Sequence, residues 1–420
     1  MTAYLLERAW VDGGVRDTVR VEIADGRFTS VEVDSDRTAA PVRGLTLPGL
    51  ANAHSHAFHR ALRGRTQQER GSFWTWRDRM YAVAERLEPD SYFALARATY
   101  REMVAAGYTS VAEFHYVHHR PDGTPYAQPD DMESALRRAA EEAGIRMSLM
   151  DACYLSSGFG KPPEGIQVRF SDGDAGRWAR RAGSGPAAIH SVRAVPRDQL
   201  RVFRGRAPLH VHLSEQRAEN EACLEAYGVT PTRLLHDEGL LGPGTTVVHA
   251  THLTDDDIEL LGASRTSVCI TPTTERDLAD GIGPARRLLD AGCALSIGSD
   301  SQAVIDPFEE LRGLEMDERL ATEQRGHWTA AELLGVGTNH AAMGIEGAGR
   351  IEVGALADLV TIDASSPRTA GTGADEQTAV FAATAQDVRQ VVVSGRVVYT
   401  RDDDEEIGRE LEAAIGRLWA

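Results

Sequence analysis

The stretch Pro208-Leu209-His210-Val211-His212-Leu213-Ser214-Glu215 is an apolar run that ends in a histidine, with a carboxylate three positions later. Short apolar runs of this kind are typical of strands buried in a parallel sheet. The pattern predicts a strand that presents His212 at its end and Glu215 in the following loop. Three other apolar segments, 48–56, 245–249 and 293–300, also end in histidine or aspartate.

Further short apolar segments are spread along the middle of the chain. Stretches with helical periodicity, such as 91–106 and 131–144, separate them. Alternation of strand and helix predicts βα units and a parallel sheet. Eight runs fit a (β/α)8 barrel, an α/β fold of the TIM-barrel type, over residues 49–350. The predicted strands are 49–55, 109–115, 146–153, 187–192, 207–213, 245–250, 266–271 and 293–299.

The two ends of the chain have a different pattern. Residues 1–48 alternate apolar and polar positions around turn signals at 12–14 and 25–26, as half-buried strands do. Residues 358–362 and 390–393 again have the apolar pattern of strands. An amphipathic helix is expected after the acidic run 402–406. Because fewer than 50 residues cannot bury a core alone, we expect residues 1–48 and 351–420 to form one composite β-sandwich.

Composition restricts the partners of the protein. The 420 residues are 42% hydrophobic, and 45 basic against 63 acidic side chains give a formal net charge of −18. Such a charge repels nucleic acid and anionic membranes, so we expect neither as a partner. The four scattered cysteines and the absence of a basic, apolar N-terminal leader predict a reduced, cytoplasmic protein.

The polar ends of the predicted strands suggest a metal centre. His54 and His56 lie two positions apart, so both face the same side of a strand. His212, His249 and Asp300 end three later strands, and strand ends meet at the C-terminal mouth of a barrel. Imidazoles and a carboxylate are common ligands of a catalytic divalent ion.

This ordered series of residues resembles the amidohydrolase superfamily, and in particular its hydrolytic deaminases with one metal. The resemblance covers essentially the whole chain. It implies a barrel flanked by a β domain from both chain ends. It also implies a set of metal ligands and a set of catalytic residues beside the metal. The implied ligands are His54, His56, His212 and Asp300, and the implied neighbours are Glu215 and His249.

The lysine content bears on the number of metal ions. Two-metal members of the superfamily commonly bridge their ions with a carboxylated lysine on the fourth strand. Here that strand, 187–190, has no lysine, and the single lysine of the chain, Lys161, lies in a Gly/Pro-rich loop. We therefore expect one divalent ion. Three histidines and an aspartate suit zinc, and iron or manganese bind similar sites.

The expected reaction is hydrolytic C–N cleavage, in which metal-activated water attacks a planar C=N carbon. Asp300 is expected to act as the base, and His249 to stabilise the tetrahedral centre. Glu215 is expected to carry a proton to the departing nitrogen, which leaves as ammonia.

Longer strings resemble the formimidoylglutamate deiminases of histidine degradation. These strings are 57–61, 72–77, 112–119, 189–195 and 272–281. The implied reaction converts N-formimidoyl-L-glutamate and water into N-formyl-L-glutamate and ammonia. The resemblance places Arg77 and Arg193 in the substrate pocket, where each can bind a carboxylate through two parallel hydrogen bonds. Tyr116 and His190 are implied as additional hydrogen-bonding partners.

Two positions differ from the pattern of these deiminases. The family more usually has glutamine where His59 stands, and histidine where Gln302 stands. Both residue types can hydrogen-bond to a carboxylate or an amidine. We therefore predict that His59 and Gln302 both bind substrate, with their roles exchanged across the pocket.

Two other functions are compatible with the sequence. A deaminase that acts on a ring amidine of the guanine, adenosine or pterin type would have the same metal ligands. Only the residues of the substrate pocket distinguish it from a formimidoylglutamate deiminase. A non-catalytic scaffold is disfavoured because the whole ligand set is present with Glu215 and His249. A homodimer is expected. His115, His118 and His119 are predicted to line the pocket or to support the residues that line it, rather than to bind metal.

Overall fold

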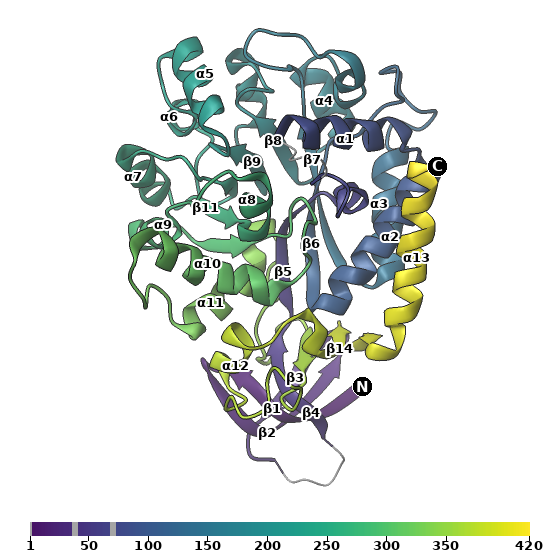
Figure 1. The fold of residues 1–420 in the computed structure, drawn as a ribbon, viewed down its shortest axis with the longest axis vertical. Helices are drawn as coiled ribbons and strands as arrows, with labels where there is room; N and C mark the ends of the chain where they lie inside the picture. The colour runs from purple at the N-terminus through teal and green to yellow at the C-terminus, as the bar shows by residue number, and fades with distance from the viewer. Residues whose placement is uncertain (1, 36–40, 68–72) are drawn as a thin grey trace.

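The computed structural model describes residues 2–35, 41–67 and 73–420, and its largest element is a parallel sheet of eight strands (Figure 1). The strands are ordered β5 to β12, as they occur in the chain. This arrangement confirms the predicted (β/α)8 barrel. Its strands are β5 (Leu50–Ser55), β6 (Tyr108–His115), β7 (Arg146–Cys153), β8 (Ala187–Ser191), β9 (Leu209–Leu213), β10 (Thr245–His249), β11 (Ser267–Ile270) and β12 (Leu295–Ile297).

Helices surround the barrel, and several begin at local signals in the sequence. The Asp306 carboxylate, for example, accepts hydrogen bonds from the first free N–H groups of α10. No helix in the described part of the chain is long and apolar enough to cross a membrane. The helices are α1 (Phe73–Arg86), α2 (Pro89–Ala106), α3 (Asp131–Ala143), α4 (Ala175–Ala182), α5 (Arg217–Tyr227), α6 (Pro231–Asp237), α7 (Asp255–Ala263), α8 (Pro272–Leu278), α9 (Ala285–Ala291), α10 (Pro307–Thr322) and α11 (Ala330–Gly337), with short 3₁₀ turns η1 (Ala57–Leu62), η3 (Gly165–Phe170), η4 (Arg197–Phe203) and η5 (His340–Met343).

The barrel closes where the last strand meets the first. The Asp300 N–H donates to the His54 carbonyl at 3.0 Å, and the His56 N–H donates to the Asp300 carbonyl at 3.2 Å. Gly298 permits this approach, because a Cβ atom there would lie only 2.7 Å from the His54 carbonyl oxygen. Closure therefore brings the two ends of the predicted metal site together.

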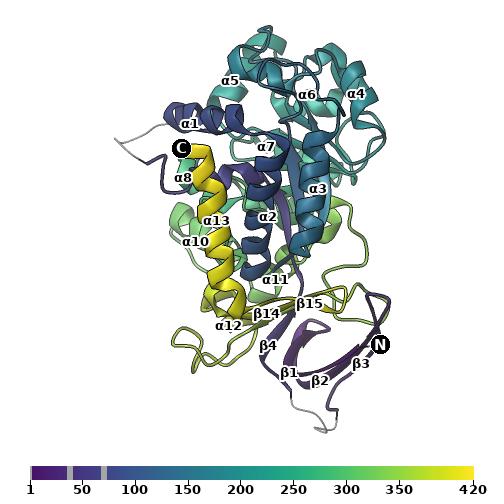
Figure 2. The same cartoon turned by 90° about the vertical axis from the view of Figure 1, so that its right-hand side faces the viewer.

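Both chain ends contribute to a second, seven-stranded sheet, as predicted (Figure 2). Its order is β15-β14-β13-β4-β1-β2-β3. β4 pairs with β1 in parallel and with β13 antiparallel, so it joins the N-terminal strands to the C-terminal ones. The elements are β1 (Thr2–Val11), β2 (Gly14–Ala24), β3 (Arg27–Glu32), β4 (Val42–Pro48), β13 (Leu359–Ile362), α12 (Glu376–Phe381), η6 (Ala385–Asp387), β14 (Val388–Val393) and β15 (Arg396–Thr400).

The two layers of the predicted sandwich come from this one continuous sheet, which curls over itself. The Tyr4 hydroxyl donates to the Gly395 carbonyl at 3.1 Å, so β1 meets the turn between β14 and β15. A small separate core fills the space between the layers, with Val19, Val21 and Leu359 buried in it. Each fully buried aliphatic side chain there contributes roughly 1.5–3 kcal/mol.

The C-terminal helix α13 (Asp404–Trp419) packs against the barrel (Figure 2). It follows the short 3₁₀ turn η7 (Arg401–Asp403). Its apolar face buries Leu411 and Leu418, and Glu410 pairs with Arg97 at 2.9 Å and with Arg101 at 2.7 Å, both on α2. The C-terminal helix thus packs against the outer surface of the barrel.

Candidate active site

The four predicted strand ends meet at the C-terminal mouth of the barrel. His54 and Ser55 end β5, and His249 ends β10. His212 is the last residue but one of β9, and Asp300 follows β12. Ser214, His249 and Asp300 have φ angles of 50°, 70° and 40°, a left-handed conformation that non-glycine residues adopt at a cost of about 1–3 kcal/mol. Such strain is concentrated at functional sites, where the surrounding structure maintains it.

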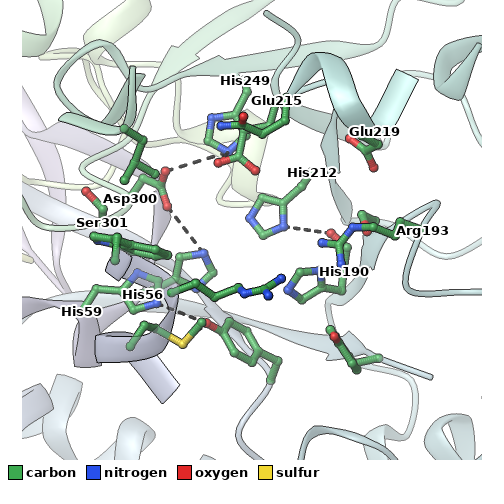
Figure 3. Close-up of a pocket in the computed structure, with 18 of the residues that line it drawn as sticks. His56, His59, His190, Arg193, His212, Glu215, Glu219, His249, Asp300 and Ser301 are labelled. Carbon is green, nitrogen blue, oxygen red and sulfur yellow. Dashed lines mark hydrogen bonds and ion pairs between the residues drawn. The ribbon is translucent and has the colours of Figure 1, made fainter. Parts of the chain in front are cut away.

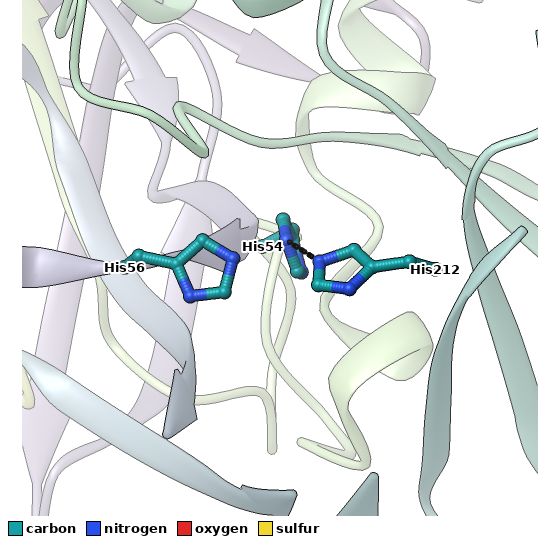
Figure 4. A group of neighbouring side chains, drawn as sticks. All are labelled: His54, His56 and His212. Atoms are coloured by element: carbon teal, nitrogen blue, oxygen red, sulfur yellow. Dashed lines mark hydrogen bonds between the residues drawn. The ribbon is translucent and has the colours of Figure 1, made fainter. Parts of the chain in front are cut away.

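Three histidine rings converge on one point (Figure 4). The Nε2 atoms of His54 and His212 lie 3.0 Å apart. The Nδ1–H of His56 donates to the Phe114 carbonyl at 2.8 Å, and that of His212 donates to the His190 carbonyl at 2.8 Å. These bonds to backbone carbonyls leave the Nε2 lone pairs facing the centre, which is how metal-binding histidines are held.

Asp300 completes this donor set. Its Oδ1 lies 3.4 Å from His54 Nε2 and 3.5 Å from His56 Nε2. Burial acts to raise the pKa of Asp300, but His54, His249 and His56 together hold it below its usual range. Burial lowers the pKa of each of the three histidines, which are therefore neutral. Three neutral imidazoles and an ionised carboxylate are the protonation states that a divalent ion requires.

His249 lies among carboxylates. Its Nε2 is 3.8 Å from Asp300 Oδ2 and 3.9 Å from Glu215 Oε1. Its Nδ1 is 3.1 Å from Thr271 Oγ1, which in turn donates to Glu275. Burial lowers the pKa of His249, but Glu215, Glu275 and Asp300 outweigh it and raise that pKa to about 10. His249 is therefore a cationic hydrogen-bond donor at neutral pH.

Glu215 faces His249 from the loop after β9 (Figure 3). Its side chain is 25% exposed, and that exposed part lines the cavity described below. Burial raises the pKa of Glu215, although His249 acts in the opposite direction. A carboxyl group that holds its proton more readily than a free glutamate is suited to carry protons in catalysis.

A cavity of about 410 Å³ opens beside these groups. Its wall includes the catalytic candidates Glu215, His249 and Asp300, as well as His56 and His212. His54 lies behind them, fully buried. Aromatic side chains form much of the remaining wall, namely Trp76, Tyr81, Tyr116, Tyr154 and Phe170.

Five of the six predicted substrate residues line this cavity. Arg77 comes from α1, and Arg193 from the loop after β8. Arg193 NH1 donates to the Ser157 carbonyl at 3.4 Å. His59 Nε2 lies 3.1 Å from the Tyr116 hydroxyl, and the His190 ring contacts the Tyr116 ring, with centroids 5.3 Å apart. Figure 3 shows His59 and His190 at the cavity. The tertiary structure thus brings two arginines to the same cavity as the metal ligands.

Gln302 differs from the prediction, because it lies outside the cavity wall. Its side chain is fully buried, and its Nε2 donates to Ser55 Oγ at 2.9 Å and to the Asp300 carbonyl at 3.0 Å. Ser55 in turn donates to Glu113 at 2.8 Å. Gln302 therefore links β5 to the loop that follows β12, and an exchange of substrate-binding roles with His59 finds no support.

Sequence reasoning missed two acidic residues of the site. Glu219 lines the cavity from the first turn of α5, four residues beyond Glu215. Glu275 lies inside the string 272–281 but was given no role. Its carboxylate is 3.6 Å from His249 Nδ1, a contact that the sequence does not reveal.

Of the two roles predicted for His115, His118 and His119, pocket lining is wrong, because none of the three lines the cavity. Side chains alternate along a strand, and Phe114 points inward, where its ring contacts the His54, His56 and His212 rings. His115 therefore points outward, toward α3. It lies 3.6 Å from Glu133, which also contacts His118 at 3.1 Å.

Arg181 is the centre of this outer cluster. The guanidinium, 7% exposed, contacts Glu133 at 2.6 Å, Asp151 at 2.7 Å and Asp172 at 2.9 Å. Both ring nitrogens of His118 face acceptors, Glu133 and the Ala152 carbonyl. His115, His118 and Glu133 are close enough to hold a metal ion, but Arg181 already supplies the positive charge there. We conclude that the cluster stabilises the fold.

Replacement of Arg181 by methionine is expected to lower the free energy of unfolding by about 3–5 kcal/mol, because it leaves three buried carboxylates without their cation. Denaturant unfolding followed by circular dichroism measures this change. Arg177→Met, on the exposed side of the same helix with a 67% exposed side chain, is the control and should unfold as the wild type does. Equal stability of both variants would contradict the role given to Arg181.

Comparison with known proteins agrees with this geometry. The model of the amidohydrolase family matches residues 45–398. The chain is 34% identical to formimidoylglutamate deiminase from Pseudomonas aeruginosa, over 100% of both chains. It is 30% identical to 5-methylthioadenosine/S-adenosylhomocysteine deaminase from Halobacterium salinarum, over 90% of this chain and 86% of that protein.

Solved structures share the whole architecture. The crystal structure of an amidohydrolase from Brucella melitensis matches with a TM-score of 0.90 and 31% identity, over 100% of both chains. An adenosine deaminase from Xanthomonas campestris, solved with bound zinc, matches with a TM-score of 0.82 and 23% identity, over 99% of this chain and 98% of that one. Because the family model spans most of the sequence, the chain belongs to the amidohydrolase family.

Proposed function

We propose that this hydrolase of C–N bonds converts N-formimidoyl-L-glutamate and water into N-formyl-L-glutamate and ammonia. The observation that carries the proposal is a single cavity that combines a metal-type donor set with two arginines, Arg77 and Arg193. A substrate with an amidine and two carboxylates matches both features. The full-length relationship to a formimidoylglutamate deiminase supports the same substrate.

The residues His54, His56, His212 and Asp300 are proposed to hold one divalent ion, with zinc the ion that suits three imidazoles and a carboxylate. When bound, such an ion is a Lewis acid that lowers the pKa of water toward neutrality. The chain itself fixes the orientation of the ligands through the carbonyls of Phe114 and His190.

Three residues are proposed to act on the reacting atoms. Asp300 accepts a proton from the water that attacks the amidine carbon. His249, held cationic by its acidic neighbours, donates a hydrogen bond to the tetrahedral centre as negative charge develops there. Glu215 gives a proton to the departing nitrogen, which converts a poor leaving group into ammonia.

Arg77 and Arg193 are proposed to bind the two carboxylates of the substrate. Tyr116, His59 and His190 supply hydrogen-bonding groups on the same wall. In a protein of net charge −18, a dianion needs such local cations. A guanidinium can form two parallel hydrogen bonds with one carboxylate, which fixes the orientation of the substrate as well as its affinity.

A substrate panel tests the proposed function. Ammonia release by the metal-loaded enzyme should be fastest with N-formimidoyl-L-glutamate, and far slower with adenosine, 5'-methylthioadenosine, guanine and pterins. A ring-amidine deaminase is the alternative, favoured by the aromatic wall of the cavity and by the adenosine-type deaminases among the relatives. Turnover of a ring amidine without turnover of the formimidoyl compound would establish the alternative.

Arg193→Lys tests the carboxylate contact directly. Lysine retains the charge but cannot form the two-pronged contact, so KM for N-formimidoyl-L-glutamate should rise by roughly 10–100-fold, equivalent to about 1.4–2.8 kcal/mol. Steady-state kinetics should show a much smaller change in kcat. Arg201→Lys, at an exposed position of η4, is the matched control. An unchanged KM in Arg193→Lys would remove Arg193 from the substrate site.

A further inference from the structure

Glu219 is a buried acid in the wall of the cavity that the proposed mechanism does not use. It lies in the first turn of α5, a helix that buries only Glu219 and Cys223 among its residues. The side chain is 8% exposed, and its Oε1 has no hydrogen-bond partner within the described part of the chain. An unsatisfied buried carboxyl oxygen costs free energy, so a ligand group that satisfies it would be stabilised.

The surroundings of Glu219 combine two positively charged groups, Arg193 and His249, with the carboxyl group of Glu215. Arg193, from the loop after β8, faces it across the same end of the cavity (Figure 3). Glu215, in the loop before α5, and His249, at the end of β10, are near enough to affect the pKa of Glu219, and Cys223 is its neighbour on α5. Within residues 2–35, 41–67 and 73–420, Arg193 forms no ion pair with a carboxylate. Glu219 therefore does not neutralise the charge of Arg193 directly.

We propose that Glu219 is a specificity-determining residue that binds a substrate carboxylate as a neutral acid, donating its O–H to the same carboxylate that Arg193 holds. The proposal rests on the proposed function, because it assigns this end of the cavity to a carboxylate of the substrate. An ionised Glu219 would repel that carboxylate, whereas the protonated form adds a hydrogen bond. Arg193 and the neutral acid together would therefore select a carboxylate over an uncharged group.

The electrostatics of the site are consistent with a neutral acid. Burial raises the pKa of Glu219 to about 7, against the effect of Arg193, and the nearby Glu215 carboxyl acts in the same direction as burial. A carboxylate bound beside Glu219 would raise this pKa further, since like charges in a poorly solvated site disfavour each other. By linkage, binding of the carboxylate must then take up a proton, and it must weaken as pH rises above neutrality.

Calorimetric titration of the zinc-loaded enzyme with glutarate tests the proposal without any turnover. Both carboxyl groups of glutarate are ionised above about pH 6.5, so they do not contribute to the linkage. Titrations in two buffers with different ionisation enthalpies, between about pH 6.5 and about pH 8.5, measure the protons taken up. The wild type should take up close to one proton at the upper end. Its Kd should rise by a factor approaching ten for each pH unit above neutrality.

Three variants separate the possible results. Glu219→Gln keeps an N–H donor that does not titrate, so its proton uptake should vanish and its glutarate affinity at high pH should exceed that of the wild type. Glu219→Ala should also lose the uptake but bind more weakly than Glu219→Gln. Glu225→Gln removes a charge from the exposed face of the same helix and should behave as the wild type does.

Other outcomes would overturn the proposal. Glutarate binding without proton uptake in the wild type would show that Glu219 does not act as an acid. Weaker binding by Glu219→Gln at every pH would show that a non-titrating donor cannot replace Glu219, and that Glu219 does not act there as a simple hydrogen-bond donor. Because glutarate is not a substrate, failure of the enzyme to hydrolyse N-formimidoyl-L-glutamate would contradict the proposed function and leave these binding results interpretable by themselves.

Discussion

Replacement of Glu215 by glutamine is expected to lower kcat for N-formimidoyl-L-glutamate by roughly 10²–10⁴-fold, the usual contribution of a positioned acid or base. Glutamine has the shape of glutamate but cannot carry a proton. In the structure Glu215 faces both the cavity and His249, and burial raises its pKa, so it holds a proton more readily than a free glutamate does. Without that proton the departing nitrogen would leave as an unstable anion.

Steady-state kinetics and metal analysis check this result together. Metal content should be unchanged, because Glu215 is not among the proposed ligands, and KM should change little, because the arginines bind the substrate. Glu221→Gln, at an exposed position of α5, serves as the control. A fall in kcat of less than about tenfold would assign the proton transfer to another group.

Removal of the divalent ion is expected to abolish ammonia release, and restoration of one equivalent of zinc to recover it. Metal analysis of protein purified without added metal should find one ion per chain. His56→Ala should lose both the ion and the activity, because it deletes one of four donors. Metal binds only the folded site, so the thermal midpoint of the wild type should also rise when zinc is restored.

A surface histidine provides the control for the metal experiment. His236→Ala removes a side chain that is 45% exposed and does not line the cavity, and it should retain the ion and full turnover. Parallel reconstitution with iron or manganese identifies which ion supports the fastest reaction. Full activity in the chelator-treated protein would exclude the proposed metal centre.

The approach of the proposed metal ligands to one another could be predicted from the sequence for a simple geometric reason. His54 and His56 are two residues apart on a strand, so they must share a face. The ends of parallel strands meet at one mouth of a barrel, so His212, His249 and Asp300 had to approach them. Strand period and barrel closure bring these groups to one mouth, and the resemblance to the amidohydrolase superfamily selects the proposed ligands among them.

The placements of Gln302 and the outer histidines could not be predicted in the same way. Alternation along β6 shows that Phe114 and His115 face opposite sides, but not which of them points inward. Gln302 follows the strand end in a segment of positive φ, where the period of two no longer applies. There, hydrogen bonds to Ser55 and the Asp300 carbonyl decided where the side chain lies.

The sequence by itself determined the order of strands and helices, the composite domain from both ends, and the residue types that meet at the barrel mouth. The strands and helices follow from local periodicity, and the composite domain follows because fewer than 50 residues cannot bury a core alone. Only the tertiary structure decided that one sheet curls into both layers of the sandwich, that Arg181 neutralises an outer cluster, and that Glu219 and Arg193 share one end of the cavity. Those contacts join segments distant in the chain, and packing between elements, rather than local pattern, sets which side chains meet.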